Sequence, residues 1–371
     1  MYTTTGVNIV VLSNETNLLP SIRQGFVETI RSFTDVSSCF SYLNRENRRR
    51  TVYVLITNFD DQSTIKSFDS LPSVEAILVY SLRRSPSQNL PKKLAGIFLT
   101  IEHLLKVLPA ILETIEKQLA GNSLLFHRDT GIGDNSDFYF YPLLKYRRSS
   151  KKMFVDKCRS VFQSNHRIHP YIDAFDRDYQ PSYAVNWLER KRNPFPFYLM
   201  VNHALRTHDN SILGPVQFFL DHLTDQMRIG GIDQTENLVY LGTSLKKNLA
   251  DRLRQCRRSD IVAFQCFLWT HLSRADEFER AIRLTTHDDS VRVLFKIRID
   301  HARCFKIGTR YLIEMATPFR VDYVTGNSTF SNRSSYLMTI KLIGVEESEI
   351  EQIYDSYYQR QIDQGPTKKL Q

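Results

Sequence analysis

The chain has 371 residues, of which 42% are hydrophobic and 24% are charged. This composition is ordinary for a globular protein, and the length suits two domains better than one. No run of about 18 apolar residues occurs, which excludes a transmembrane helix. The start of the chain has no basic segment, and its apolar stretch at residues 7–12 is too short for a secretory signal. We therefore expect a cytoplasmic protein.

The net charge is +9, and short basic runs such as residues 48–50 contribute to it. Runs of this kind are usually solvated loops, and no nucleic-acid-binding motif accompanies them. A dinucleotide or an acidic protein partner would be attracted by the same positive field, so nucleic acid is not the favoured partner. The 5 cysteines form no C-x-x-C pair and no spaced cluster with histidines, so we expect no metal site and no disulfide framework.

The first 120 residues alternate between strand-like and helix-like patterns. Apolar, β-branched runs occupy residues 8–12, 52–56 and 76–80, with a weaker run at 96–99. Continuous runs of this kind are typical of parallel strands that are buried on both faces. Helical patterns lie between them at 21–30, 36–43 and 65–71, and a long amphipathic helix at 104–119 closes the series.

These elements predict a small α/β module with a doubly wound parallel sheet, flavodoxin-like in outline. The module resembles receiver-type and TIR-type domains at the level of the fold only. No glycine-rich phosphate loop follows the first strand, so we interpret it as an interaction module without chemistry.

The predicted boundaries follow from composition. The module covers residues 1–121, and a glycine-, aspartate- and asparagine-containing linker follows at 122–135. A second domain of the α+β class covers residues 136–360, and residues 361–371 form a frayed tail.

A helix predicted over residues 197–206 contains several polar side chains. It places Tyr198, Asn202 and Leu205 on one side, with Arg206 one turn beyond Asn202. The next helical pattern, at 212–227, is apolar core. Taken alone, Asn202 and Arg206 are interpreted as a structural polar pair rather than a ligand site.

The order of the following strands changes that interpretation. A strand at 237–242 ends in Tyr240-Leu241-Gly242, and a second covers 263–272. A strictly alternating strand follows at 291–300, and the last covers 311–321 and ends in Phe319-Arg320-Val321.

Together with the helix, this series resembles the arginine-type (R-S-E) mono-ADP-ribosyltransferases over residues 150–345. In that family an N-x-A-L-R helix is followed by strands carrying V-Y-R-G, F-x-S-T-S and V-L-F-x-I-x-I-D, then E-x-E and a strand ending in F-R-V. The resemblance implies a helical lobe followed by a mixed or antiparallel β-core.

The resemblance also implies NAD as the substrate and a transferase of the glycosyltransferase class. In the family an arginine anchors the dinucleotide, the serine strand positions it, and a carboxylate holds the ribose and faces the ribosyl cation of the transition state. The positions that the resemblance assigns to NAD binding are Tyr198, Asn202, Arg206, Tyr240, Gly242 and Thr270.

The residues that should carry the chemistry are replaced. Leu241 occupies the arginine position, Trp269 and His271 flank Thr270 where S-T-S would stand, and Arg310 falls on the second glutamate of E-x-E. Losing a charge attraction of about 4 kcal/mol costs roughly a thousandfold in rate, and a repulsion in its place costs more. We therefore predict a pseudoenzyme acting with a protein partner that the sequence does not identify.

Two alternatives stay open. If the register slips in the short loop after Asp300, Glu314 is the nearby carboxylate that could restore an active enzyme. A non-enzymatic interaction scaffold is the other. For the replaced residues, His271 is either an acid–base group or structural, and Trp269 either stacks on a base or fills the nicotinamide pocket.

Overall fold

The computed structural model describes residues 7–15, 17–25, 30–46, 52–81, 91–127, 149–163, 168–189, 197–229, 237–258, 260–283, 290–325, 337–346, 348–349 and 352. The chain forms two compact units. Unit 1 comprises Met1–Gly121, Arg147–Gln226 and Arg283–Ser290, and unit 2 comprises Asn122–Tyr146, Met227–Ile282 and Val291–Gln371. Within the described residues, no helix has both the length and the apolar character needed to cross a membrane.

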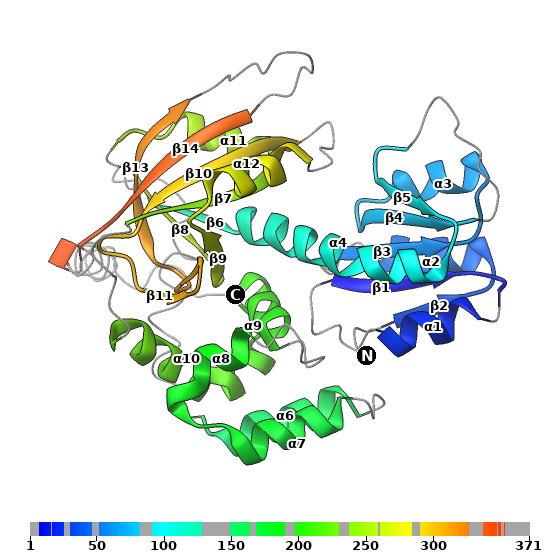
Figure 1. The fold of residues 1–371 in the computed structure, drawn as a ribbon, viewed down its shortest axis with the longest axis horizontal. Helices are drawn as coiled ribbons and strands as arrows, with labels where there is room; N and C mark the ends of the chain where they lie inside the picture. The colour runs from blue at the N-terminus through cyan, green and yellow to red at the C-terminus, as the bar shows by residue number, and fades with distance from the viewer. Residues whose placement is uncertain are drawn as a thin grey trace, which may run out of the picture. The chain divides into compact units, whose positions relative to one another are not determined.

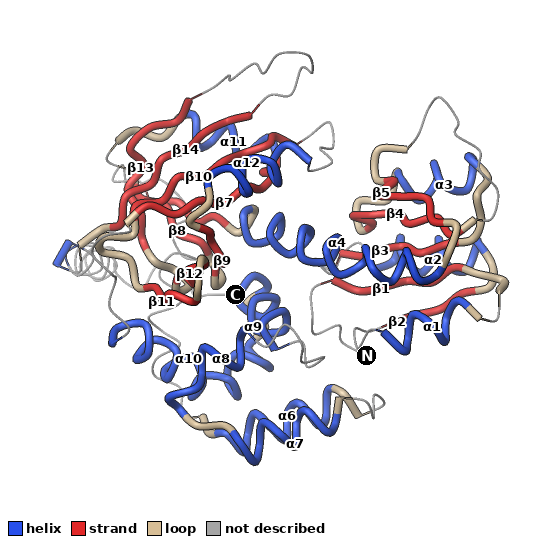
Figure 2. The backbone as a smooth tube through the Cα atoms, viewed as in Figure 1, coloured by secondary structure: helices blue, strands red, loops and turns tan. Residues whose placement is uncertain are grey.

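Unit 1 begins with a five-stranded parallel sheet whose order is β2-β1-β3-β4-β5. This is the flavodoxin-like strand order, so the predicted fold class of the first module is confirmed. Its strands are β1 (Val7–Leu12), β2 (Ile30–Phe33), β3 (Val52–Thr57), β4 (Val74–Tyr80) and β5 (Leu94–Phe98). Its helices are α1 (Leu18–Gly25), α2 (Val36–Glu46), α3 (Gln62–Asp69) and α4 (Ile101–Gly121) (Figures 1 and 2).

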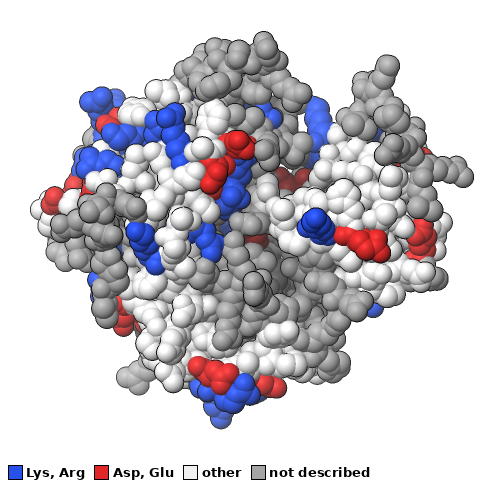
Figure 3. Space-filling view, viewed as in Figure 1, with Lys and Arg blue, Asp and Glu red and all other residues white. Residues whose placement is uncertain are grey.

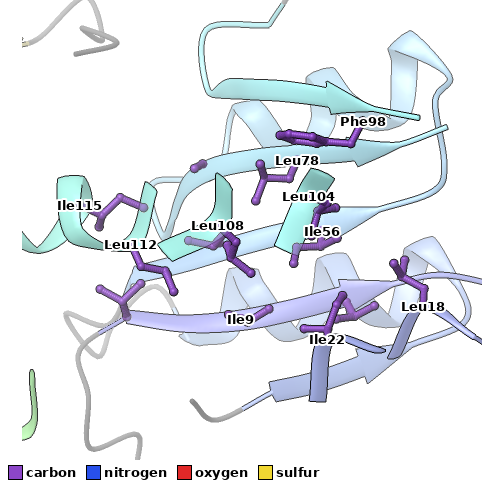
Figure 4. Close-up of a cluster of buried hydrophobic side chains, with 14 residues drawn as sticks. Ile9, Leu18, Ile22, Ile56, Leu78, Phe98, Leu104, Leu108, Leu112 and Ile115 are labelled. Atoms are coloured by element: carbon purple, nitrogen blue, oxygen red, sulfur yellow. The ribbon is translucent and has the colours of Figure 1, made fainter. Parts of the chain in front are cut away.

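Both faces of this sheet are buried, as the continuous apolar runs predict. On β1, Ile9 packs with α1 and α4 on one face, while Val10 packs with α2 and α3 on the other. Figure 4 shows the first of these clusters, in which Leu104, Leu108 and Leu112 of α4 lie against the sheet. Helix α3 begins at a side-chain cap, because Asp61 accepts the backbone N–H of Thr64 at 2.8 Å.

Between residues 149 and 226, the described elements of unit 1 are helices. It contains α6 (Lys151–Val161), α7 (His169–Asp178), the short η3 (Pro181–Tyr183), α8 (Ala184–Glu189), α9 (Phe197–Thr207) and most of α10 (Asn210–Ile229). Aromatic side chains hold these helices together: the ring centroids of Phe197 and Phe219 lie 4.3 Å apart, and those of Phe154 and Phe197 lie 5.0 Å apart.

Unit 2 is built on a nine-stranded mixed sheet with the order β11-β12-β9-β7-β10-β14-β13-β8-β6. This confirms the predicted second fold class. The strands are β6 (Leu124–His127), β7 (Leu238–Lys246), β8 (Ile261–Phe264), β9 (Leu268–His271), β10 (Ser290–Arg298), β11 (Cys304–Ile307), β12 (Arg310–Ile313), β13 (Pro318–Thr325) and β14 (Leu337–Gly344). Two helices, α11 (Lys247–Arg254) and α12 (Arg274–Arg283), follow β7 and β9.

Four segments differ from the sequence prediction. Strand β2 was not predicted, because Ile30 was assigned to a helix that ends at Gly25. The strand predicted at 263–272 is two strands, β8 and β9, which lie far apart in the sheet order. The strand predicted at 311–321 is likewise two strands, β12 and β13, which are not neighbours in the sheet. The predicted linker at 122–135 begins with β6, which pairs with β8 in the mixed sheet, and its residues from 128 onward lie outside the described residues. So does the predicted tail at 361–371.

Candidate functional site

Four of the predicted site residues lie on one face of the mixed sheet. Tyr240 of β7 and Arg310 of β12 are both register partners of His271 on β9. Residues directly opposite each other on neighbouring strands point to the same face, and so does Trp269, two positions before His271. All four side chains are half-buried. We refer to Tyr240, Trp269, His271 and Arg310 as the β9–β12 face.

The most specific contact on the β9–β12 face joins the two largest replacements. The guanidinium carbon of Arg310 lies 4.9 Å from the centroid of the Trp269 ring, within the range of a cation–π contact. The residue at the predicted glutamate position therefore contacts the ring of the residue at the first serine position.

The intervening residues point to the opposite face, which is core. Leu241, Thr270 and Tyr311 are buried, and the Thr270 hydroxyl donates to the backbone carbonyl of Tyr311 at 3.1 Å. Leu241 and Thr270 are thus turned away from the β9–β12 face. The strands bring Tyr240, Trp269, His271 and Arg310 together but not these two predicted positions.

A carboxylate that the sequence analysis missed supports the face from α12. Glu277 has an exposed fraction of 0%, and its Oε2 accepts the backbone N–H of Gly242 at 2.7 Å. Its Oε1 lies 3.2 Å from Nε of Arg280 and 3.8 Å from Nε2 of His271. The sequence signal that could have found it is an acidic residue in the first turn of α12, among the positions Phe278 and Ala281 that pack onto the sheet.

Gly242 permits this close approach. A Cβ atom at this position would lie 1.9 Å from the backbone carbonyl oxygen of Glu277. Only glycine fits where α12 touches β7. The packing of the helix is thus sufficient to explain a glycine at a position that the resemblance assigns to NAD binding.

Glu314, the alternative carboxylate, is held by a neighbouring arginine. Its Oε2 lies 3.4 Å from Nη1 of Arg303, and its backbone N–H donates to the Arg303 carbonyl at 2.9 Å. The Glu314 side chain is only 7% exposed. The carboxylate is therefore committed to an ion pair in this structure.

The polar residues of α9 are mostly buried within unit 1. Asn202 has an exposed fraction of 0%, and Tyr198 is half-buried. Nη1 of Arg206 lies 3.3 Å from Oε2 of Glu116 on α4, and these side chains are 10% and 6% exposed. Burial raises the pKa of Glu116, while Arg206 acts against this shift. The sequence analysis interpreted Asn202 and Arg206 as a structural polar pair. In the structure, Arg206 forms an ion pair with Glu116.

His203, next to Asn202, is 8% exposed. Burial, with a contribution from the charge of Arg206, lowers its pKa to about 4, so the imidazole is neutral at pH 7.

Metal ligands do not gather anywhere in the described part of the chain: no group of three or more His, Cys, Asp or Glu side chains there could hold an ion. Burial also raises the pKa of Cys39 and of Cys304 to about 12, which leaves these thiols protonated and unreactive.

Among known proteins, no family model and no curated protein matches this chain. The solved structures that match include ADP-ribosyltransferases, the family that the sequence motifs resemble. They include the ADP-ribosyltransferase Vis, 14% identical with a TM-score of 0.35, covering 58% of this chain and 92% of Vis. C3larvin toxin from Paenibacillus larvae is 11% identical with a TM-score of 0.30, covering 46% of this chain and 98% of the toxin.

Exoenzyme S from Pseudomonas aeruginosa, in complex with human 14-3-3 protein beta and bound to carba-NAD, is also similar. It is 11% identical with a TM-score of 0.31, and the match covers 52% of this chain and 88% of that chain. Identities and TM-scores this low assign no role to any residue of this chain.

Proposed function

We propose that this chain is an ADP-ribosyltransferase-like protein that has lost the capacity to transfer ADP-ribose from NAD. The observation that carries the proposal is the position of Arg310. The motif order places a catalytic carboxylate there, and a guanidinium stacked on Trp269 occupies it instead.

The physical reason is the charge that develops in the reaction. Breaking the bond between nicotinamide and ribose produces a ribosyl cation, which a preorganised carboxylate stabilises. Two unit charges about 4 Å apart interact by roughly 4 kcal/mol at an effective dielectric constant near 20. Replacing this attraction with a repulsion of similar size slows the reaction by about six orders of magnitude, because each 1.36 kcal/mol is a factor of ten in rate.

Among the residues that the structure describes, two carboxylates close to these strands have other partners. Glu277 accepts a hydrogen bond from the Gly242 backbone and has no exposed surface. Glu314 is paired with Arg303. For the flavodoxin-like module of unit 1, we propose binding of a protein partner, since no glycine-rich loop follows β1.

The test is calorimetric titration of the full chain with NAD, with nicotinamide release measured in the same sample. We expect no nicotinamide release above the rate in buffer. Release would contradict the proposal, and Glu314→Gln would then decide which carboxylate is used: loss of the activity would assign it to Glu314. Glu346→Gln is the matched control, because Glu346 belongs to the same unit and its side chain is 66% exposed.

A further inference from the structure

We propose that β5 is a dimerisation edge. Two copies of this chain pair their β5 strands antiparallel about a twofold axis at Ile97, which joins five strands from each copy into one continuous sheet. This inference names the protein partner of the flavodoxin-like module and therefore rests on that part of the proposed function. It does not depend on the proposed loss of transferase activity.

The first support is a comparison of the strands that end the two described sheets, which are β2, β5, β6 and β11. An edge strand presents unpaired backbone groups, and a charged side chain or a covering element usually keeps other chains from pairing with them. Strand β2 has Arg31 and β11 has Lys306 within its length. On β6, the side chains of Leu124–Phe126 are all buried.

Strand β5 has neither kind of protection among the described residues. No charged residue and no proline occurs from Leu94 to Leu99. Ile97 is 41% exposed and Leu99 is 37% exposed, and Ala95 is also exposed. Of the four exposed large hydrophobic side chains in the described residues, two therefore lie at this edge. An uncharged apolar edge favours pairing with another strand.

The second support is the direction of the backbone groups. The Phe98 carbonyl accepts the N–H of Ser81 at 3.1 Å, so it is directed toward β4. The β4–β5 register is regular from Gly96 to Phe98. Because alternate residues of such a ladder bond to the neighbouring strand, the N–H and C=O of Ile97 point outward. Two copies related by a twofold axis at Ile97 can thus exchange a pair of hydrogen bonds.

The third support is self-complementarity, which favours a second copy over a different protein. The exposed side chains of Ala95 and Leu99 are placed symmetrically about Ile97. Lys92 and Glu102, both exposed, lie five positions before and five positions after it. An antiparallel twofold arrangement brings Lys92 of each copy toward Glu102 of the other. Such exposed pairs contribute little to affinity, but opposite charges favour this register over shifted ones.

The expected dimer is weak. A stable interface buries roughly 800 Å² on each partner, and one short strand with its neighbours supplies less than that. We therefore expect a dissociation constant on the order of 10 µM, which corresponds to an association free energy that a small interface can reach.

The main experiment is sedimentation velocity of the full chain at concentrations from about ten times below to about ten times above this value. We expect a concentration-dependent dimer. Ile97→Lys places two like charges opposite each other at the axis and should weaken the dimer at least tenfold. Ser32→Lys is the matched control, because it adds the same charge at an exposed position of β2, on the other edge of the same sheet. Far-ultraviolet circular dichroism checks that both variants are folded.

The register is tested by cross-linking with a short bismaleimide. Cys256→Ser is the background, since the other cysteines are buried. We expect Ile97→Cys in this background to give a covalent dimer and Ser32→Cys to give none. The charge pair is tested by exchange: Lys92→Glu should weaken the dimer, and Lys92→Glu combined with Glu102→Lys should restore it.

Three results would each overturn this inference. They are a monomer at every concentration, equal weakening by Ile97→Lys and Ser32→Lys, and equal cross-linking of the two cysteine variants. None of them affects the proposed loss of transferase activity, because nicotinamide release is measured separately. Release of nicotinamide by a dimeric chain would overturn that loss and leave the dimerisation edge in place.

Discussion

Helix α9 and the β9–β12 face both carry positions that the family resemblance assigns to NAD, and the structure treats them in opposite ways. On α9, Asn202 is fully buried and Arg206 is paired with Glu116. On the β9–β12 face, Trp269, His271 and Arg310 are half-buried and stand side by side. The helix motif that is kept in the sequence is thus mostly buried in unit 1, whereas three of the replaced positions are only half-buried.

This difference shows that a retained motif and a retained site are separate properties. Replacing an arginine of a buried ion pair is costly, because its partner charge is then buried without compensation. This cost is the same whether or not the arginine binds a ligand. A half-buried strand position can change without that cost. Figure 3 shows Lys and Arg side chains, in blue, on the surface over the mixed sheet of unit 2.

The largest effect is expected where α12 supports the β9–β12 face. Gly242→Ala would place a Cβ atom 1.9 Å from the Glu277 carbonyl oxygen, which belongs to the backbone and cannot rotate away. We expect a loss of at least about 4 kcal/mol in the stability of unit 2. Thermal unfolding measures this loss. Gly308→Ala is the control, because a Cβ atom there would have no atom within 4 Å and only the strain of a φ of +59° would be added. A stable Gly242→Ala variant would contradict the close contact.

The next effect concerns the buried pair of α9. Glu116→Gln leaves the Arg206 guanidinium without its carboxylate at 10% exposure. We expect a loss of about 3 kcal/mol in the free energy of unfolding, because removing one partner of a buried ion pair leaves an uncompensated charge. Glu102→Gln on the exposed side of the same helix serves as the control. Equal effects of the two substitutions, measured by denaturant titration, would argue against a structural role for the pair.

A smaller effect is expected from pH, again on α9. The folded pKa of His203 is about 4, below the ordinary value of about 6.5 of an unfolded chain. The unfolded state therefore binds the proton first, and this group lowers stability as the pH falls from about 6.5 to about 4, by up to roughly 3 kcal/mol. Above pH 6.5 the group has no effect. His203→Gln should flatten that part of a stability–pH curve, and an unchanged slope would contradict the assigned burial.

The smallest effect is expected in tryptophan fluorescence, which compares the helices of unit 1 with the β9–β12 face. Trp187 packs in the helices of unit 1 with an exposed fraction of 4%, while Trp269 is half-buried. The variant Trp187→Phe leaves Trp269 as the only tryptophan, and Trp269→Phe leaves Trp187. We expect acrylamide to quench the first variant several-fold more strongly than the second. Equal quenching would mean that the β9–β12 face is not more accessible than the interior of the helices.

The sequence predicted the features that depend on neighbouring residues and missed those that depend on residues far apart in the chain. The strands β1, β3 and β4 were predicted because each is an unbroken β-branched run, while the edge strand β2 contains Arg31 and Ser32 and lacks this signal. The division of residues 263–272 into β8 and β9 could not be predicted from local pattern. The two halves pair with different strands, β8 with β6 and β13, and β9 with β7 and β12.

The same limit applies to the candidate site. The replacement of a glutamate by Arg310 was visible from motif order alone, but its stacking on Trp269 depends on the register of β9 and β12. Glu277 was missed because its role arises only when α12 packs on Gly242, 35 positions earlier in the chain. The turning of Leu241 and Thr270 into the core also required the strand register.

The central claim, that a positive charge at Arg310 prevents the transfer of ADP-ribose, is tested most directly by Arg310→Glu. The measurement is the rate of nicotinamide release from NAD by this variant and by the unaltered chain. A carboxylate at this position would attract the ribosyl cation instead of repelling it, so the account predicts a higher rate of release by the variant. An unchanged rate in a folded variant would contradict it.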